Sequence, residues 1–105
     1  MKMEIRRLPR QSIESFASMN DLTMNVHERR EKTLPKWFCY FSEVEVKRNS
    51  VLSMECGEGA TIKEAIEDYC KNLSFKHVIC RATDPEMRKE IFMGELTPEY
   101  HGETE

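Results

Sequence analysis

The stretch that decides the fold is CGEGATIKEAIEDYCKNL, residues 56–73. Thr61 stands three residues before Glu64, which is the spacing of a capping box, where side chains bind the free backbone N–H groups of a helix start. The apolar residues that follow recur at helical spacing and are Ile62, Ala65, Ile66, Tyr69 and Leu73. This pattern predicts an amphipathic helix from Thr61, with Gly57 and Gly59 forming the turn that leads into it from a strand.

The segments before this helix predict a shorter helix, a strand and a loop. Ser12 is placed to cap a helix whose apolar face is Ile13, Phe16 and Ala17, and Asn20 follows it. Residues 22–27 alternate strictly between apolar and polar side chains, which is the pattern of a half-buried strand. Residues 29–35 are charged and rich in helix and strand breakers, so they predict a loop.

Residues 36–46 and 51–56 are predicted to form two neighbouring strands. In the first, alternation places Phe38, Tyr40, Val44 and Val46 on the core face, and Trp37, Cys39, Phe41, Glu43 and Glu45 on the other face. If Val46 lies beside Leu52, the connecting loop must have three residues, Arg48 to Ser50, because a loop of two or four would turn Leu52 to the opposite face.

The whole pattern predicts an α+β fold. Residues 76–83 and 90–96, joined by the turn 84–87 with Pro85, predict a final hairpin. We therefore expect a single domain over residues 1–105, with two helices on one face of an antiparallel sheet and the order α-β-β-β-α-β-β. Residues 1–9 are expected to form an N-terminal arm and residues 97–105 a loose tail.

Composition narrows the function classes. Sixteen Lys and Arg against nineteen Asp and Glu leave a formal net charge of −3, so no overall basic field attracts nucleic acid or an acidic membrane. The four cysteines form no Cys-x-x-Cys pair and are expected to be reduced core residues. No long apolar run occurs and no apolar stretch follows the charged start MKMEIRRL, so we expect a soluble, cytoplasmic protein without a signal peptide.

No residue pattern predicts catalysis. The histidines His27, His77 and His101 lack Glu-x-x-His or His-x-Glu neighbours, and the cysteines have apolar neighbours that favour inert thiols. We therefore expect no enzyme activity, no metal and no cofactor.

The order helix, three strands, helix resembles the double-stranded RNA-binding domain over residues 11–73. In that family a Gly-x-Gly-x-Ser segment leads into a helix that begins Lys-Lys-x-Ala-Lys, and Gly57, Gly59, Thr61 and Lys63 match it. Ile62 and Ile66 stand where the family has its other two lysines. The resemblance implies phosphate contacts by Lys63, to which the basic loop residues Arg29, Arg30, Lys32 and Lys36 would add. With one family lysine of three retained, we expect duplex RNA affinity no tighter than micromolar, and we favour a structural turn over a phosphate site at the glycines.

The segment GEGATIKEAIEDY, residues 57–69, is also similar to small accessory proteins of tailed bacteriophages. Such proteins include inhibitors of bacterial defence systems, anti-CRISPR proteins among them. This resemblance implies a phage-encoded protein that binds a host protein complex in the host cytoplasm.

The strand at residues 36–46 carries the predicted binding surface. If both helices cover the opposite face, Trp37 and Phe41 are exposed beside Glu43 and Glu45, as a surface for a partner protein or for a homodimer. The alternative is that the N-terminal arm or the last hairpin covers the two rings. We predict a non-enzymatic protein-binding module, of which an anti-CRISPR-like inhibitor is the expected type. The alternative function is an RNA- or DNA-binding domain that uses Arg29, Arg30, Lys32, Lys36 and Lys63.

Overall fold

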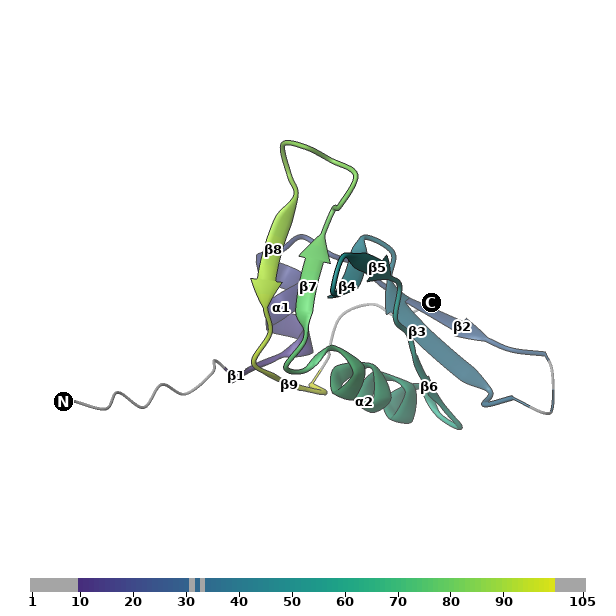
Figure 1. Cartoon of the computed structure of the whole chain (residues 1–105). Coiled ribbons are helices and arrows are strands. Elements are labelled where there is room, and N and C mark those ends of the chain that lie inside the picture. Colours follow the sequence, from purple (N-terminus) through teal and green to yellow (C-terminus); the bar gives the residue numbers. More distant parts are fainter. Residues whose placement is uncertain (1–9, 31, 33, 100–105) are drawn as a thin grey trace.

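The structure is a computed structural model that describes residues 10–30, 32 and 34–99. Within these residues the chain forms two helices and nine strands in three sheets (Figure 1). In chain order they are β1 (Arg10–Ser12), α1 (Ile13–Met19), β2 (Met24–Glu28), β3 (Trp37–Phe41), β4 (Val44–Arg48), β5 (Val51–Ser53), β6 (Gly57–Gly59), α2 (Ile62–Leu73), β7 (His77–Cys80), β8 (Lys89–Phe92) and β9 (Glu95–Thr97). The α+β class is confirmed, but the predicted order and the single sheet are wrong.

The strands are divided among three sheets and do not form the single antiparallel sheet that was predicted. β2, β3 and β6 form one antiparallel sheet, and β5, β4, β7 and β8 form a second, in that order. β1 and β9 form a parallel pair that joins the two ends of the described chain. The predicted loose tail therefore overlaps β9 at Thr97. The predicted N-terminal arm lies outside the described residues.

Both predicted helices are confirmed, together with their N-caps. The Ser12 hydroxyl accepts from the Ser15 backbone N–H at 3.0 Å, and Thr61 accepts from Glu64 N–H at 3.1 Å. The Glu64 carboxylate accepts from the Ala60 N–H at 3.1 Å, which completes the reciprocal cap one residue earlier than expected. Neither helix of the described chain has the length and apolar character needed to cross a membrane.

The predicted strand 36–46 is broken by a turn at Ser42 and Glu43. Phe41 before the turn and Val44 after it are both buried, although they are three positions apart. The turn therefore reverses the alternation, so the core-facing residues of β3 are Cys39, Phe41 and, in part, Trp37. For this reason the prediction that Phe38 faces the core is wrong, and Tyr40, on the same face as Phe38, is only partly buried against the core.

The β4–β5 hairpin has a shorter loop than predicted. Arg48 pairs with Val51 and Lys47 with Leu52, so only Asn49 and Ser50 form the turn. Asn49 takes a positive φ of 59°, a conformation that asparagine tolerates better than most residues. Leu52 therefore lies on the same face as Lys47, opposite to the face of Val46.

The core is centred on Phe41, which links the two helices. Its ring centroid lies 6.0 Å from that of Phe16 in α1 and 5.6 Å from that of Tyr69 in α2. The backbone N–H of Phe41 donates to the buried Tyr69 hydroxyl at 2.9 Å. Burial raises the pKa of that hydroxyl, so it stays protonated at neutral pH.

α2 packs directly on β6 because Gly57 and Gly59 have no side chain (Figure 1). A Cβ on Gly57 would overlap the Ala65 carbonyl oxygen and the backbone of Tyr69. Neither glycine has a positive φ, so close approach, and not an unusual backbone angle, is the reason for glycine here. The helix also seals the free edge of β6, since Asp68 accepts from Glu58 N–H and Asn72 donates to the Cys56 carbonyl.

Candidate functional site

The outer face of the β2–β3–β6 sheet carries a row of functional side chains. The register places His27 of β2 opposite Phe38 of β3, and Phe38 opposite Glu58 of β6. Tyr40 lies two residues along β3, on the same face as Phe38. This surface lies opposite to the side that α2 covers, and we call its residues His27, Arg29, Phe38, Tyr40 and Glu58 the aromatic face.

The three rings of the aromatic face lie close together in nearly parallel planes. The His27 centroid is 5.0 Å from that of Phe38 and 5.7 Å from that of Tyr40, with interplanar angles of 21° and 13°. Phe38 and Tyr40 are 6.2 Å apart at 9°. His27 is exposed and the other two rings are half-buried. Ring contacts at these distances stabilise the cluster while its outer surface stays accessible.

Arg29 is held in place at the edge of the aromatic face. Its guanidinium lies 4.5 Å from the Phe38 ring centroid and forms an ion pair with the Glu58 carboxylate. The same group donates to the Pro35 carbonyl at 3.2 Å, and the Arg29 backbone N–H donates to Lys36 O. These contacts give a cation with a fixed direction, only 20% exposed in its side chain.

A hollow of about 360 Å³ adjoins the aromatic face. Its lining residues are His27, Glu28, Arg29, Arg30, Leu34 and Phe38. The Glu28 carboxylate is engaged by the Lys36 ammonium at 3.5 Å. Two arginines and two apolar side chains therefore determine the character of the hollow, and the exposed Lys32 follows in the same loop.

The predicted partner-binding residues do not form one exposed patch. Phe41 is fully buried, so the expectation of an exposed Trp37 and Phe41 pair is wrong. Trp37 packs against the core and has the Lys36 ammonium 5.7 Å from its ring centroid. Helices α1 and α2 supply the rings that cover Phe41, whereas the alternative considered from the sequence was cover by the N-terminal arm or the last hairpin.

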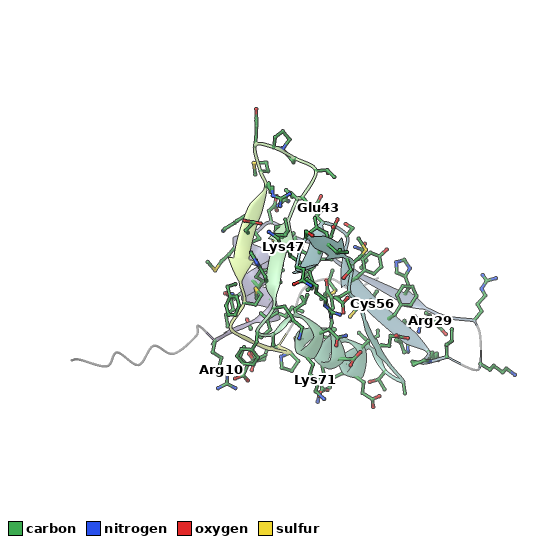
Figure 2. All side chains as sticks on the ribbon, in the orientation of Figure 1. Arg10, Arg29, Glu43, Lys47, Cys56 and Lys71 are labelled. Carbon is green, nitrogen blue, oxygen red and sulfur yellow. The ribbon has the colours of Figure 1, made fainter. Side chains whose placement is uncertain are left out.

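Glu43 and Glu45 lie in a different part of the molecule from the aromatic face. The Glu43 carboxylate is 3.1 Å from the guanidinium of Arg81, which also donates to the carbonyls of Asn20 and Asp21. Figure 2 shows Glu43 far from Arg29. Glu45 pairs with Ile79 in the second sheet and lines a hollow of about 280 Å³ with Glu43 and Arg81. Glu43 therefore has a structural partner within the chain.

Two of the five basic residues predicted to bind nucleic acid form ion pairs within the protein. Arg29 pairs with Glu58 and Lys36 with Glu28, whereas Arg30, Lys32 and Lys63 are exposed. At the start of α2 the Glu64 carboxylate already accepts a backbone N–H, and it places a negative charge beside Lys63. A carboxylate in this position competes with a bound phosphate.

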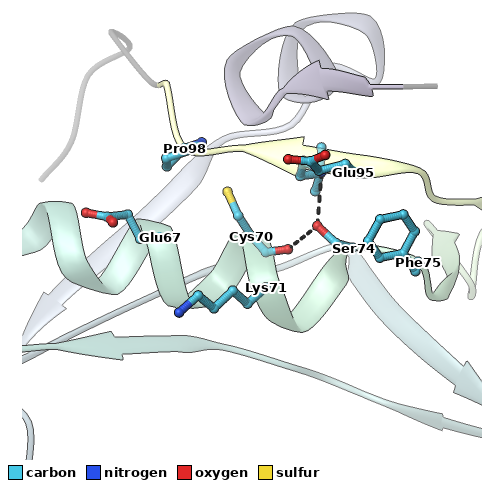
Figure 3. Close-up of a pocket in the computed structure, with 8 residues that line it drawn as sticks. Glu67, Cys70, Lys71, Ser74, Phe75, Glu95 and Pro98 are labelled. Carbon is cyan, nitrogen blue, oxygen red and sulfur yellow. Dashed lines mark hydrogen bonds between the residues drawn. The ribbon is translucent and has the colours of Figure 1, made fainter. Parts of the chain in front are cut away.

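A hollow that involves a thiol lies between α2 and β9. It measures about 390 Å³ and is lined by Glu67, Cys70, Lys71, Ser74, Phe75, Glu95, Leu96 and Pro98 (Figure 3). The Ser74 hydroxyl donates to the Cys70 carbonyl at 2.6 Å and accepts from the Leu96 N–H at 3.0 Å, so it joins helix to strand. Burial, with a smaller contribution from Glu67, raises the pKa of the Cys70 thiol to about 12. Within the described residues, no group of three or more His, Cys, Asp or Glu side chains is placed to hold a metal ion.

All four thiols are expected to react slowly at neutral pH. Burial raises the pKa of Cys39 to about 12 and also raises the pKa values of Cys56 and Cys80. Because the thiolate is the reactive form, labelling by a thiol reagent should quicken by about tenfold for each pH unit as the pH rises toward the pKa. The half-buried Cys56 should react first, and Cys56→Ser should remove that phase. Complete labelling of any cysteine within seconds at pH 7 would contradict this expectation.

Comparison with protein-family models, curated proteins and solved structures finds no match for this chain. The two resemblances therefore stay predictions, and the argument for function rests on the aromatic face. His27 lies on the polar face that the sequence predicted for it, whereas Phe38 and Tyr40 were assigned to the core face. The signal that could have found them is the spacing of two between Phe38 and Tyr40 on β3, and between His27 of β2 and Arg29, which directly follows β2.

Proposed function

We propose that this protein is a non-enzymatic protein-binding module and that the aromatic face is its contact surface. The observation that carries the proposal is the partly exposed cluster of His27, Phe38 and Tyr40 with Arg29 fixed beside it. Aromatic residues and arginine are the types enriched at the centres of protein interfaces and among the residues that dominate binding energy. The buried core lies on the other side of the sheet, and of the three rings only Tyr40 also packs against it.

The partner in this proposal is a host protein or protein complex. The resemblance of residues 57–69 to small phage proteins supports an inhibitor of a host defence complex, of anti-CRISPR type, that acts in the host cytoplasm. Self-association as a homodimer through the same face is the other protein partner that the ring cluster would suit.

Removing two rings should abolish capture of the partner. The double variant Phe38→Ala and Tyr40→Ala should keep its fold and weaken binding by about 2 kcal/mol or more, which is about 30-fold. The measurement is a pull-down from bacterial lysate with mass spectrometry, and sedimentation of the purified chain tests self-association.

The matched control is Phe92→Ala, because Phe92 is an aromatic residue on the second sheet that is 59% exposed. It should capture the same proteins as the unchanged chain. If the double variant and the unchanged chain capture the same proteins in the same amounts, the aromatic face is not the contact surface.

Binding of RNA or DNA is the second candidate function. The observation that favours it is the position of His27 and Phe38 in the same hollow as the exposed Arg30, since single strands bind to aromatic surfaces flanked by cations. The net charge of −3 and the pairing of Arg29 and Lys36 with carboxylates favour the protein partner.

A further inference from the structure

The Arg29–Glu58 ion pair points to the chemistry of the partner. We propose that Glu58 occupies, in the free protein, the position that a carboxylate of the partner takes in the complex. The partner then presents an acidic segment with an aromatic or aliphatic side chain beside the acid. This inference rests on the proposed function, because it describes the occupant of the same surface.

The first support is that contacts within the protein already hold the Arg29 guanidinium in a position where it binds a carboxylate. Its guanidinium is fixed by the Phe38 ring and the Pro35 carbonyl, and it receives a carboxylate from β6, across β3. Arginine holds carboxylates through a planar fork of N–H donors, and little side-chain entropy is lost when the fork is already fixed. The Glu58 side chain is itself 38% exposed, so another carboxylate can approach the pair from solvent.

The second support is the charge of the adjoining hollow. Its lining holds Arg29 and Arg30 against one carboxylate, Glu28, which the Lys36 ammonium engages. The chain as a whole carries −3, so this positive excess is local. Complementary charge selects partners and speeds their association.

The third support is the apolar part of the same hollow. Leu34 is 46% exposed, and Phe38 forms the wall next to it. An apolar side chain of the partner would cover both, next to the acid that Arg29 and Arg30 receive. The combination fits an acidic peptide segment better than a bare phosphate, which would leave the apolar wall uncovered.

If Glu58 competes with the partner for Arg29, removal of the Glu58 charge should strengthen binding of the partner. Glu58→Gln removes the internal competitor and keeps the shape of the side chain, so acidic ligands should bind about three to tenfold more tightly. Arg29→Gln removes the cation, and the same ligands should bind at least tenfold more weakly. If the ion pair only held strands together, Glu58→Gln would leave binding unchanged or weaken it.

The probe is a library of random dodecapeptides, selected on the full chain and counter-selected on the Phe38→Ala and Tyr40→Ala variant. We expect the selected peptides to be enriched in Asp and Glu next to an aromatic or aliphatic residue. The best peptide is then titrated against the unchanged chain, Glu58→Gln and Arg29→Gln, with a ten-nucleotide oligouridine as competitor. Thermal melts of each variant identify any change in folding.

Three outcomes would overturn the inference. They are selection of basic or uncharged peptides or of none, an unchanged or weaker affinity in Glu58→Gln, and tighter binding of oligouridine than of the best peptide. If the pull-down still depends on Phe38 and Tyr40 while the peptides show no acidic preference, the contact surface stands and the acidic partner is wrong. If neither measurement depends on the two rings, the proposed function itself fails.

Discussion

Phe41→Ala should destabilise the protein by about 3 to 5 kcal/mol, a loss large enough to unfold a domain of this size. The ring is fully buried between Phe16 and Tyr69, so alanine would leave a cavity there. The Phe41 backbone N–H also relies on the Tyr69 hydroxyl, whose position depends on the ring packing. Urea denaturation followed by circular dichroism measures the loss.

Phe38→Ala is the matched control for this change, because it makes the same substitution three residues earlier on the same strand. Phe38 is half-buried on the outer face and contacts His27 and Arg29, so its loss should cost about 1 kcal/mol or less. Equal losses of stability in the two variants would contradict the assignment of Phe41 to the core face of β3 and of Phe38 to its outer face.

Local signals in the sequence were sufficient for the helices. Ser12 and Thr61 lie at the two N-caps, and of the five apolar residues predicted to form one face of the second helix, Ala65, Ile66, Tyr69 and Leu73 are buried and Ile62 is partly buried. A cap and a repeat of 3.6 residues involve only neighbours along the chain, so no knowledge of the remaining fold is needed to place them.

The face of β3 could not be predicted from the sequence in the same way. Four of the five residues in WFCYF are aromatic, so both faces look apolar and hydrophobicity does not choose between them. The core face of β3 was therefore assigned by extending the alternation of Val44 and Val46 backwards along the chain. The turn at Ser42 and Glu43 shifts this alternation by one residue. One unrecognised turn therefore exchanged the core with the surface and moved the candidate site from Trp37 and Phe41 to Phe38 and Tyr40.

The remaining errors concern contacts between distant segments. The parallel pairing of Arg10–Ser12 with Glu95–Thr97 joins three-residue strands that have no periodic signal of their own. The ladder between Cys39 and Gly57 exists because α2 holds β6 in place through Asp68 and Asn72. Both pairings follow from tertiary packing, which alternation along a single strand does not report.

Gly57→Ala adds one methyl group and should destabilise the fold strongly, because that methyl group would lie between the backbones of β6 and α2. The added Cβ would overlap the Ala65 carbonyl oxygen and the Tyr69 backbone, and neither can move without shifting α2 away from β6. Such a shift would break the β3–β6 ladder and the contacts of Asp68 and Asn72 with β6, and it would loosen the packing of Tyr69 on Phe41. We expect a loss of more than about 4 kcal/mol, or failure to fold.

The backbone angle of Gly57 indicates that any loss of stability in Gly57→Ala comes from close packing. Gly57 has no positive φ, so alanine carries no conformational penalty there, and replacing a glycine would stabilise the chain slightly if space allowed. Ala60→Gly is the matched control, since Ala60 is exposed between β6 and α2, and it should cost about 1 kcal/mol or less. Thermal melts of both variants show whether Gly57 is needed for the close packing of α2 on β6 or only for a flexible turn before α2. A cooperatively folded Gly57→Ala with nearly unchanged stability would mean that the glycines serve only as a flexible turn, and that α2 does not rest on the backbone of β6.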